Sequence, residues 1–432
     1  MRETPERLLR GLFDAALDAV SPARCVPPHL PPRPAGRTVV VGAGKAAAAM
    51  AAAVERHWTG ELSGVVVVPY GHAVACRRVA VIEAAHPLPD EAGMAAARAV
   101  LDAVRSLAPD DLVLALISGG GSALLALPAP GITLADKQAV TRALLGCGAS
   151  IGEINAVRKP LSAIKGGRLA AAARPARLAT LVISDVPGDD PATVASGPTL
   201  PNVATIEDAR KILVRYGIAP PRAVAALLAR GGEALSPDRA AFAADHVAVV
   251  ARARDGLAAA AALAERSGLA CGMLGDAIEG EAREVGRAHA TLAAASGNRG
   301  RLLLSGGETT VTLSAAGGAG GRNTEYLLSL AIALKGRHRL WALACDTDGI
   351  DGNGDAAGAI LRPDSLARAR DRGIDPGAML EQHRSGEFFA ALGDLIRTGP
   401  TCTNVNDFRA ILVDPGGGPP TPRAGTGAAV DL

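Results

Sequence analysis

Short runs of Val, Leu, Ile and Ala that end in glycine or aspartate turns recur along most of the chain, and they constrain the fold more than any other feature. Clear examples are RTVVVGAG at 37–44, DLVLALISGGG at 111–121 and RLATLVISDVPGDD at 177–190. These runs are continuously apolar, which is typical of strands buried on both faces, and helical stretches separate them. The pattern predicts an α/β fold with mostly parallel sheets, in which ligands bind at the carboxyl ends of the strands.

The predicted strands fall into two sets. Between about 217 and 244 the chain is rich in Pro and Gly, and its 432 residues are too many for one ordinary core. We predict two α/β domains flanking an active-site cleft: a Rossmann-like N-terminal domain at 1–240 and a C-terminal α/β domain at 241–414. The strand at 246–256 would be the first of the second domain. The Gly- and Pro-rich residues 415–432 are expected to form a flexible tail.

The composition excludes several classes of protein. A net charge of +2 without a basic block, together with 2% aromatic residues, argues against nucleic-acid binding. No apolar run reaches the ~18 residues of a membrane span. The N-terminal MRETPERLLRGLF has no signal-peptide apolar region, and the six cysteines form no C-x-x-C pair. We therefore expect a cytoplasmic protein that acts on small molecules, as a monomer or a homodimer.

Two Ser-Gly-Gly turns follow predicted strands, one in each proposed domain. The first, SGGGS at 118–122, would present main-chain N–H groups to an anion, but no lysine follows it as in the usual phosphate loop. The second is SGGE at 305–308. Two such turns suggest an anion site between the domains, and the alternative is that a common turn recurs by chance.

A third glycine loop, VGAGK, resembles a dinucleotide-binding fingerprint. Gly42, Gly44 and Ala47 match G-x-G-x-x-A between a strand and a helix. The acidic residue that should end the next strand, at 62–71, is missing. Lys45 at the start of the helix fits a phosphate contact better, and the alternative is an exposed first-turn lysine.

Two acidic turns, SDVPGDDP and DTDGIDGNGD, are candidate Mg²⁺ sites because this ion takes one or two carboxylates plus substrate phosphates. Turn formation around Pro187-Gly188 and simple solvation are the alternatives. The loop GGRN brings Arg322, whose guanidinium can bind a carboxylate or phosphate, to the start of a helix. In NAVRKPLSAIKGGRLA at 155–170, four basic residues lie close together, and either one of them reaches the cleft or they cover a solvated helix face.

Taken together, the motifs resemble those of type II glycerate kinase (glycerate 2-kinase), whose C-terminal part is known as the MOFRL domain. The resemblance runs in order from about residue 5 to 413, with one departure at Cys402, where asparagine is more familiar. The motifs that carry it are VGAGKAAAAMA, HPLPDEAG, ISGGGSALL, NAVRKPLSAIKGGRLA, ISDVPGDDPATVASGPT, LSGGETTVTL, GRNTEYLL, DTDGIDG and PTCTNVND. The resemblance implies transfer of the ATP γ-phosphate to D-glycerate, giving 2-phosphoglycerate, with Lys45 and Arg322 in the active site. Members have also been named hydroxypyruvate reductases, which is the alternative activity and implies NAD(P)H.

These arguments give a set of expected site residues. The catalytic residues would be Lys45, Arg322 and Asp189, and Mg²⁺ would be held by Asp190 and Asp351. ATP would be bound by residues of the glycine and serine turns and by the glutamate that follows the second turn: Gly44, Ser118, Gly119, Gly120, Gly121, Ser122, Ser196, Gly306 and Glu308.

Overall fold

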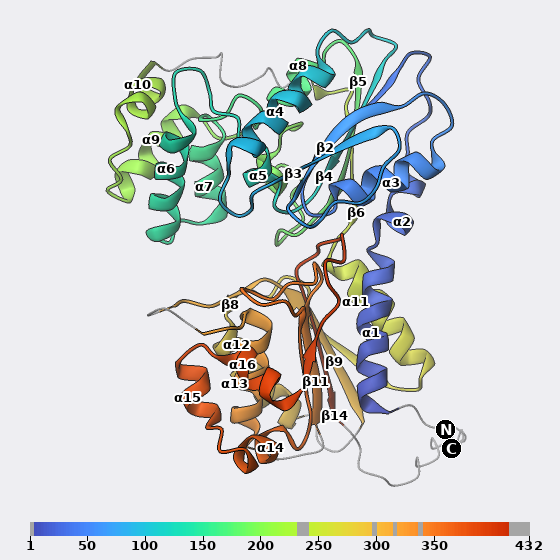
Figure 1. Ribbon diagram of the computed structural model, residues 1–432, viewed down its shortest axis with the longest axis vertical. Coiled ribbons are helices and arrows are strands. Elements are labelled where there is room, and N and C mark those ends of the chain that lie inside the picture. Colours follow the sequence, from blue (N-terminus) through green and yellow to red (C-terminus); the bar gives the residue numbers. More distant parts are fainter. Residues whose placement is uncertain (1–3, 231–241, 296–299, 314–317, 336–339, 414–432) are drawn as a thin grey trace, which may run out of the picture.

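The computed structural model describes residues 4–230, 242–295, 300–313, 318–335 and 340–413. The predicted domain boundary at 240/241 and the predicted tail lie outside these residues. Figure 1 shows two α/β domains stacked end to end, each built on its own sheet, as the sequence predicts. No helix among the described residues is long and apolar enough to cross a membrane.

The first sheet has six strands, all parallel, in the order β3-β2-β1-β4-β5-β6. Their bounds are β1 (Thr38–Ala43), β2 (Ser63–Pro69), β3 (Val79–Ala84), β4 (Leu112–Ile117), β5 (Arg177–Ile183) and β6 (His246–Ala251). Every residue of β1 and β4 is buried, which confirms that the continuous apolar runs are central strands. This strand order is that of dinucleotide-binding folds, whose ligands lie at the carboxyl edge.

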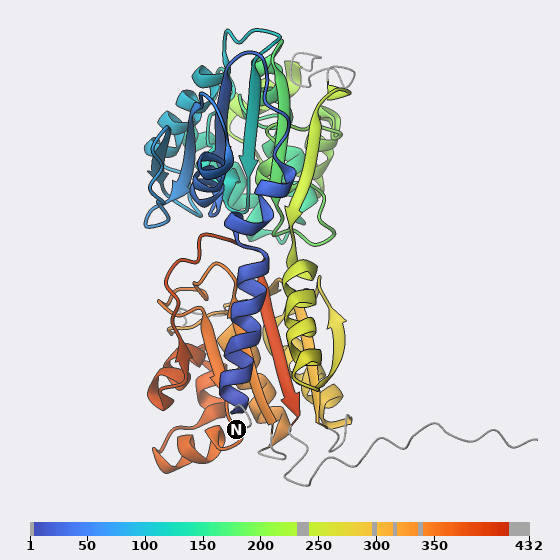
Figure 2. The ribbon, with the colours of Figure 1, turned by 90° about the vertical axis from the view of Figure 1, so that its right-hand side faces the viewer.

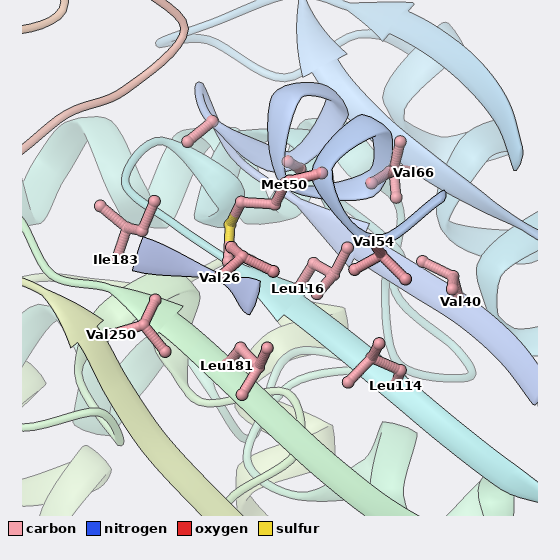
Figure 3. Packing of buried hydrophobic residues seen from close by; sticks show 14 of the residues in the cluster. Val26, Val40, Met50, Val54, Val66, Leu114, Leu116, Leu181, Ile183 and Val250 are labelled. Carbon is pink, nitrogen blue, oxygen red and sulfur yellow. The ribbon is translucent and has the colours of Figure 1, made fainter. Parts of the chain in front are cut away.

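Helices cover both faces of this sheet. In Figure 3, Met50 and Val54 of α3 pack over Val40, Leu114 and Leu181 from three adjacent strands. The helices of this domain are α2 (Pro22–Cys25), η1 (Pro27–His29), α3 (Ala47–His57), α4 (Glu91–Val104), α5 (Gly121–Leu124), α6 (Leu134–Gly146), α7 (Ile151–Arg158), α8 (Arg168–Ala173), η2 (Val194–Ser196), α9 (Ile206–Arg215) and α10 (Arg222–Arg230).

The second sheet differs from the prediction of a mostly parallel sheet. Its order is β13-β12-β11-β14-β9-β7, and only β7 and β9 pair in parallel. The chain passes from β11 to β12 through a turn without a crossover helix, and a direct return of this kind gives antiparallel pairing. The bounds are β7 (Ala270–Gly275), β9 (Arg301–Gly307), β11 (Leu340–Asp346), β12 (Gly358–Leu361), β13 (Leu395–Ile396) and β14 (Asp407–Val413); a separate pair is formed by β8 (Gly280–Glu281) and β10 (Thr309–Thr310).

Two elements belong to the domain opposite to the one expected. The strand at 246–256 was expected to open the second domain, but β6 extends the first sheet beside β5. Helix α1 (Pro5–Ala19) packs its apolar face on the second domain, where Phe13 meets Phe408 at a ring-centroid distance of 5.6 Å. Figure 2 shows α1 beside α11 (Ala253–Arg266) along this sheet. The other helices here are α12 (Ala282–Ala295), α13 (Arg322–Leu334), α14 (Ser365–Asp371), α15 (Pro376–Glu381) and α16 (Ser385–Leu392).

Candidate active site

A cavity of about 920 Å³ lies between the two domains, at the carboxyl edge of the first sheet. Both domains line it. Its polar lining residues include Lys45, His72, His86, Gly120 and Asp185 from the first domain and Glu308, Arg322, Asp346, Asp348, Asn404 and Asn406 from the second. Residues separated by hundreds of positions in the sequence therefore share one polar site.

The glycine loop after β1, VGAGK, is held by hydrogen bonds to β2 and to the glycine loop after β4. The main-chain N–H groups of Gly44, Lys45 and Ala46 donate to Val67 O at 3.0 Å, Gly119 O at 2.9 Å and Ser118 Oγ at 3.0 Å. In a dinucleotide-binding fold, the helix after the first strand points its free N–H groups at the pyrophosphate. Here three of these groups in the loop already have protein acceptors.

The anion-binding capacity lies instead in the loop after β4. Within the described part of the chain, the N–H groups of Gly119 and Gly120 donate to no acceptor. Gly120 has a φ of 80° and opens the short helix α5, so its conformation favours glycine. A Cβ on Gly119 would lie 1.7 Å from Asp185 Oδ2, so a side chain there would collide with the cavity wall. The loop therefore presents bare main chain directly beside an acidic side chain.

Lys45 joins the two domains. Its ammonium group forms an ion pair with Asp348, which lies in the turn after β11. Burial alone would lower the pKa of Lys45, but the carboxylates of Asp348, Asp346 and Asp185 outweigh burial and raise the pKa. Lys45 is therefore a charged lysine in the cavity at neutral pH.

Arg322 is the corresponding cation of the second domain, at the first residue of α13. Its guanidinium donates to Asp407 Oδ1 at 2.8 Å, Asp346 Oδ2 at 2.8 Å and Glu308 Oε1 at 2.9 Å. Asp346 and Asp407 are buried, whereas the Glu308 side chain is 44% exposed. The guanidinium is thus fixed on two sides and is bound on its third side by a solvent-exposed partner.

The cavity holds an excess of carboxylates. Burial and the nearby negative charge of Glu308 raise the pKa of Asp185 to about 6. Burial and the charge of Asp348 likewise raise the pKa of Asp346. Asp185 Oδ2 accepts from Asn404 Nδ2 at 3.0 Å, while Asp185 Oδ1 and Glu308 Oε2 accept no hydrogen bond from another described residue. Two carboxylate oxygens, one from each domain, are therefore free for a cation or a substrate.

Comparisons with known proteins agree on one family. A domain of unknown function, DUF4147, matches residues 8–229, and the MOFRL family matches residues 301–407. The chain is 39% identical to the glycerate 2-kinase of Pyrococcus horikoshii, with 88% of each chain covered. The chain belongs to the glycerate kinase family.

Two further relatives extend this result. The crystal structure of the glycerate kinase of Thermotoga maritima superimposes with a TM-score of 0.84 at 37% identity, covering 94% of this chain and 99% of that one. A protein of Agrobacterium vitis whose provisional name is hydroxypyruvate reductase is 55% identical, with 94% of each chain covered. The resemblance to type II glycerate kinases is confirmed, and both activity names occur among the relatives of this glycerate kinase family member.

Most residues that the sequence predicted for the site lie at the cavity or at its glycine loop. Lys45, Gly120, Glu308 and Arg322 line the cavity. The remaining loop residues support it, and Ser122 Oγ lies 2.7 Å from Ser196 Oγ behind the loop. The supporting residues are Gly44, Ser118, Gly119, Gly121, Ser122 and Ser196.

Four predicted residues lie elsewhere and have local partners. Asp189 forms an ion pair with Arg254 at 2.7 Å outside the large cavity. Asp190 accepts from Ala192 N and Thr193 Oγ1, both at 3.0 Å, and so stabilises its own turn. Gly306 lies within β9, where its carbonyl accepts from Ile278 N at 3.1 Å. These three residues are not among those that line the large cavity, and the roles expected of them stay predictions.

Asp351, the other predicted Mg²⁺ ligand, caps α13. Its two carboxylate oxygens accept from the N–H groups of Asn323 and Thr324, both at 2.9 Å, and from both side chains. An acidic group at a helix N-terminus is stabilised by the helix dipole. Asp351 therefore positions the start of α13, and with it Arg322, rather than facing the cavity.

The aspartates that line the cavity come from the two predicted acidic turns but differ from the predicted Asp189, Asp190 and Asp351. The residues that line it are Asp185, Asp346 and Asp348, which lie within two residues of the ends of β5 and β11. Closeness to the carboxyl end of a strand was the available signal, because ligands in such sheets bind at that edge. His86 and Asn404 also line the cavity; they lie in the motifs HPLPDEAG and PTCTNVND, which were quoted only for the family resemblance.

Proposed function

We propose that this protein transfers the γ-phosphoryl group of ATP to the 2-hydroxyl of D-glycerate, giving 2-phosphoglycerate and ADP with the help of Mg²⁺. One observation carries the proposal: a single cavity brings together the free N–H groups of the glycine loop, two fixed cations and two free carboxylate oxygens. Phosphoryl transfer depends almost entirely on positioning and charge neutralisation, and these are the groups that it needs.

The phosphates of ATP would lie at the loop after β4. The free N–H groups of Gly119 and Gly120 point to no protein acceptor in the described part of the chain, and such groups bind phosphate oxygens well. Lys45 follows the neighbouring glycine loop and lines the same cavity. Its charge would stabilise the phosphoryl group during transfer, supplying the cation that the glycine loop itself lacks.

The residues present fit a magnesium ion. Asp185 and Glu308 each offer a free carboxylate oxygen from opposite domains, and Mg²⁺ is commonly held by one or two carboxylates together with substrate phosphates. In the described ranges, no group of three or more His, Cys, Asp or Glu side chains could hold a metal ion. When bound, Mg²⁺ supplies charge neutralisation for the phosphates.

Arg322 would orient glycerate through its carboxylate. Asp346 and Asp407 hold two sides of the guanidinium, and Glu308 on the third side is the exposed partner. Exchange of Glu308 for the substrate carboxylate keeps three carboxylates on Arg322 and leaves Glu308 free to face the metal. The planar guanidinium provides the fork that a carboxylate binds.

A second candidate is NAD(P)H-dependent reduction of hydroxypyruvate. It is favoured by the provisional name of the 55% identical relative and by the strand order of the first sheet. The closed loop at Gly44 and Lys45 argues against it, because three N–H groups that would face the pyrophosphate have protein acceptors. We therefore propose the kinase first.

The test of this assignment is ADP release from Mg-ATP, with and without D-glycerate, by the protein and by its Lys45→Met variant. We expect ADP release that depends on glycerate and on Mg²⁺, and a loss of kcat of at least ~100-fold in the variant, as for removal of one transition-state donor. Lys211→Met, which changes an exposed lysine on α9, is the matched control. Retention of activity within threefold by Lys45→Met would remove Lys45 from the mechanism.

A further inference from the structure

The predicted basic segment and one lysine from α6 form a cluster in the first domain. We define the basic cluster as Lys137, Arg158, Lys159 and Lys165, which come from α6, α7 and the turn before α8. Three of the four have less than a tenth of their surface exposed, and Arg158 is half-buried. The chain has only six lysines among its 45 basic residues, and three of them lie here.

Lys165 has a structural role. Its ammonium group is fully buried and donates to Ser122 O at 2.7 Å and Leu125 O at 2.8 Å, at the carboxyl end of α5. It therefore supports the glycine loop from behind. Lys137 donates to Leu127 O at 3.3 Å in the segment that follows. These contacts place Lys165 and Lys137 against residues 122–127, behind the loop that would hold the phosphates.

The side chains of Arg158 and Lys159 have no such role. Neither forms a hydrogen bond or an ion pair with any other described residue, although only 6% of the Lys159 surface is exposed. Their nitrogen atoms are not sealed from solvent, since neither belongs to the buried polar atoms that lack a partner. Two cations thus reach solvent from positions that are otherwise enclosed.

The positive charges of the basic cluster are buried and repel one another. Burial and the charges of Arg158 and Arg168 lower the pKa of Lys137 to about 7. Burial lowers the pKa of Lys159 as well, and the Asp190 carboxylate offsets part of this shift. Like charges gathered with so little compensation destabilise a folded protein, so such an arrangement indicates an anionic ligand.

A hydrogen-bond chain links α7 to the glycine loop. Asn155 Oδ1 accepts from Ser196 Oγ at 2.7 Å, and Ser196 Oγ lies 2.7 Å from Ser122 Oγ. Arg158 and Lys159 follow Asn155 by three and four residues, which places them on the same side of the helix. Figure 1 shows α6 and α7 side by side.

A triphosphate carries more negative charge than Lys45 and Arg322 can offset while both are paired with carboxylates. The cations of the interdomain cavity are already paired, Lys45 with Asp348 and Arg322 with three carboxylates, and with Asp185 the acids outnumber the bases. We propose that Arg158 and Lys159 bind the polyphosphate of the nucleotide, which would lie on the first domain while glycerate lies on the side of Arg322. This assignment rests on the proposed function and adds the residues that hold ATP.

The experiment compares Arg158→Gln, Lys159→Gln and the double variant with wild type, with Lys159→Arg to retain the charge and Lys211→Gln as the exposed control. The quantities measured are KM for ATP, KM for D-glycerate and kcat. Loss of charge-assisted hydrogen bonds should raise KM for ATP by ~10- to 100-fold in the double variant, with KM for glycerate unchanged within twofold. Lys159→Arg should restore most of the affinity. An unchanged KM for ATP, or an equal rise for both substrates, would overturn the assignment.

Binding of inorganic tripolyphosphate, followed by thermal shift and calorimetry without turnover, separates this inference from the proposed function. We expect tripolyphosphate to stabilise wild type and Lys211→Gln but not the double variant. If wild type fails to phosphorylate glycerate yet shows this pattern, the proposed function fails and the polyphosphate site stands. If tripolyphosphate stabilises all variants equally, the site fails, whatever the activity. The unliganded double variant should melt no lower than wild type because it removes like-charge repulsion, whereas a structural role would lower its melting temperature.

Discussion

Gly119→Ala is the smallest change that tests whether the loop after β4 and Asp185 form one site. A Cβ at this position would lie 1.7 Å from Asp185 Oδ2 and 2.7 Å from Asn404 Nδ2. Gly119 does not have a positive φ, so alanine can adopt its backbone conformation and the effect is steric. Because ordinary contact requires about 3.4 Å, either the carboxylate or the loop must move by well over 1 Å.

A displacement of about 1 Å at a reacting centre can reduce turnover ~100-fold, and overpacking of a filled site costs ~1–3 kcal/mol of stability. We therefore expect kcat for glycerate-dependent ADP release to fall at least ~100-fold while the protein remains folded. The control is Gly146→Ala at the end of α6, where a Cβ would meet no atom within 4 Å. That variant should keep its activity and gain at most ~1 kcal/mol in its free energy of unfolding. Activity of Gly119→Ala within threefold of wild type would refute the proposed geometry.

Two further predictions separate structural from chemical roles of the aspartates. Asp351→Asn should lower the free energy of unfolding by roughly 3 kcal/mol in urea denaturation without Mg²⁺, because an amide replaces the carboxylate that accepts from Asn323 and Thr324; a loss that appears only with Mg²⁺ would indicate a metal ligand. Burial and Glu308 raise the pKa of Asp185 to about 6, so the folded protein binds the extra proton and its stability should fall as pH rises from about 4 to about 6. Asp185→Asn should remove this change in the free energy of unfolding, which amounts to at most ~3 kcal/mol. A variant with the same pH dependence of stability as wild type would contradict the buried, acidic environment assigned to Asp185.

The first sheet was predictable because its strands are continuously apolar. Such runs are buried on both faces, and their composition alone distinguishes them from strands of a half-exposed sheet. The composition of a strand does not show which other strand it pairs with. The strand β6 reads as the start of the second set, yet it pairs with β5, and helix α1 gives no local sign that it packs on the second domain.

The turns that carry the site could be predicted from the sequence, but the ion pairs and hydrogen bonds between their side chains could not. Lys45 and Arg322 were found because a cation beside a glycine loop is unusual locally. The pairing of Lys45 with Asp348 joins residues 303 positions apart, and no local pattern records it. Within the turn after β5, Asp185 faces the cavity while Asp189 turns toward Arg254, because the chain reverses at Pro187-Gly188 between them.

The central claim is tested most directly by the product formed from Mg-ATP and D-glycerate. ADP release is followed together with conversion of the product by enolase, which uses 2-phosphoglycerate, while NADH oxidation with hydroxypyruvate is measured on the same preparation. We predict ADP and enolase signal in equal amounts and no NADH oxidation. ADP without direct enolase signal would place the phosphate on the wrong hydroxyl. NADH oxidation without ADP would contradict the kinase assignment and make the loop at Gly42–Gly44 a dinucleotide site.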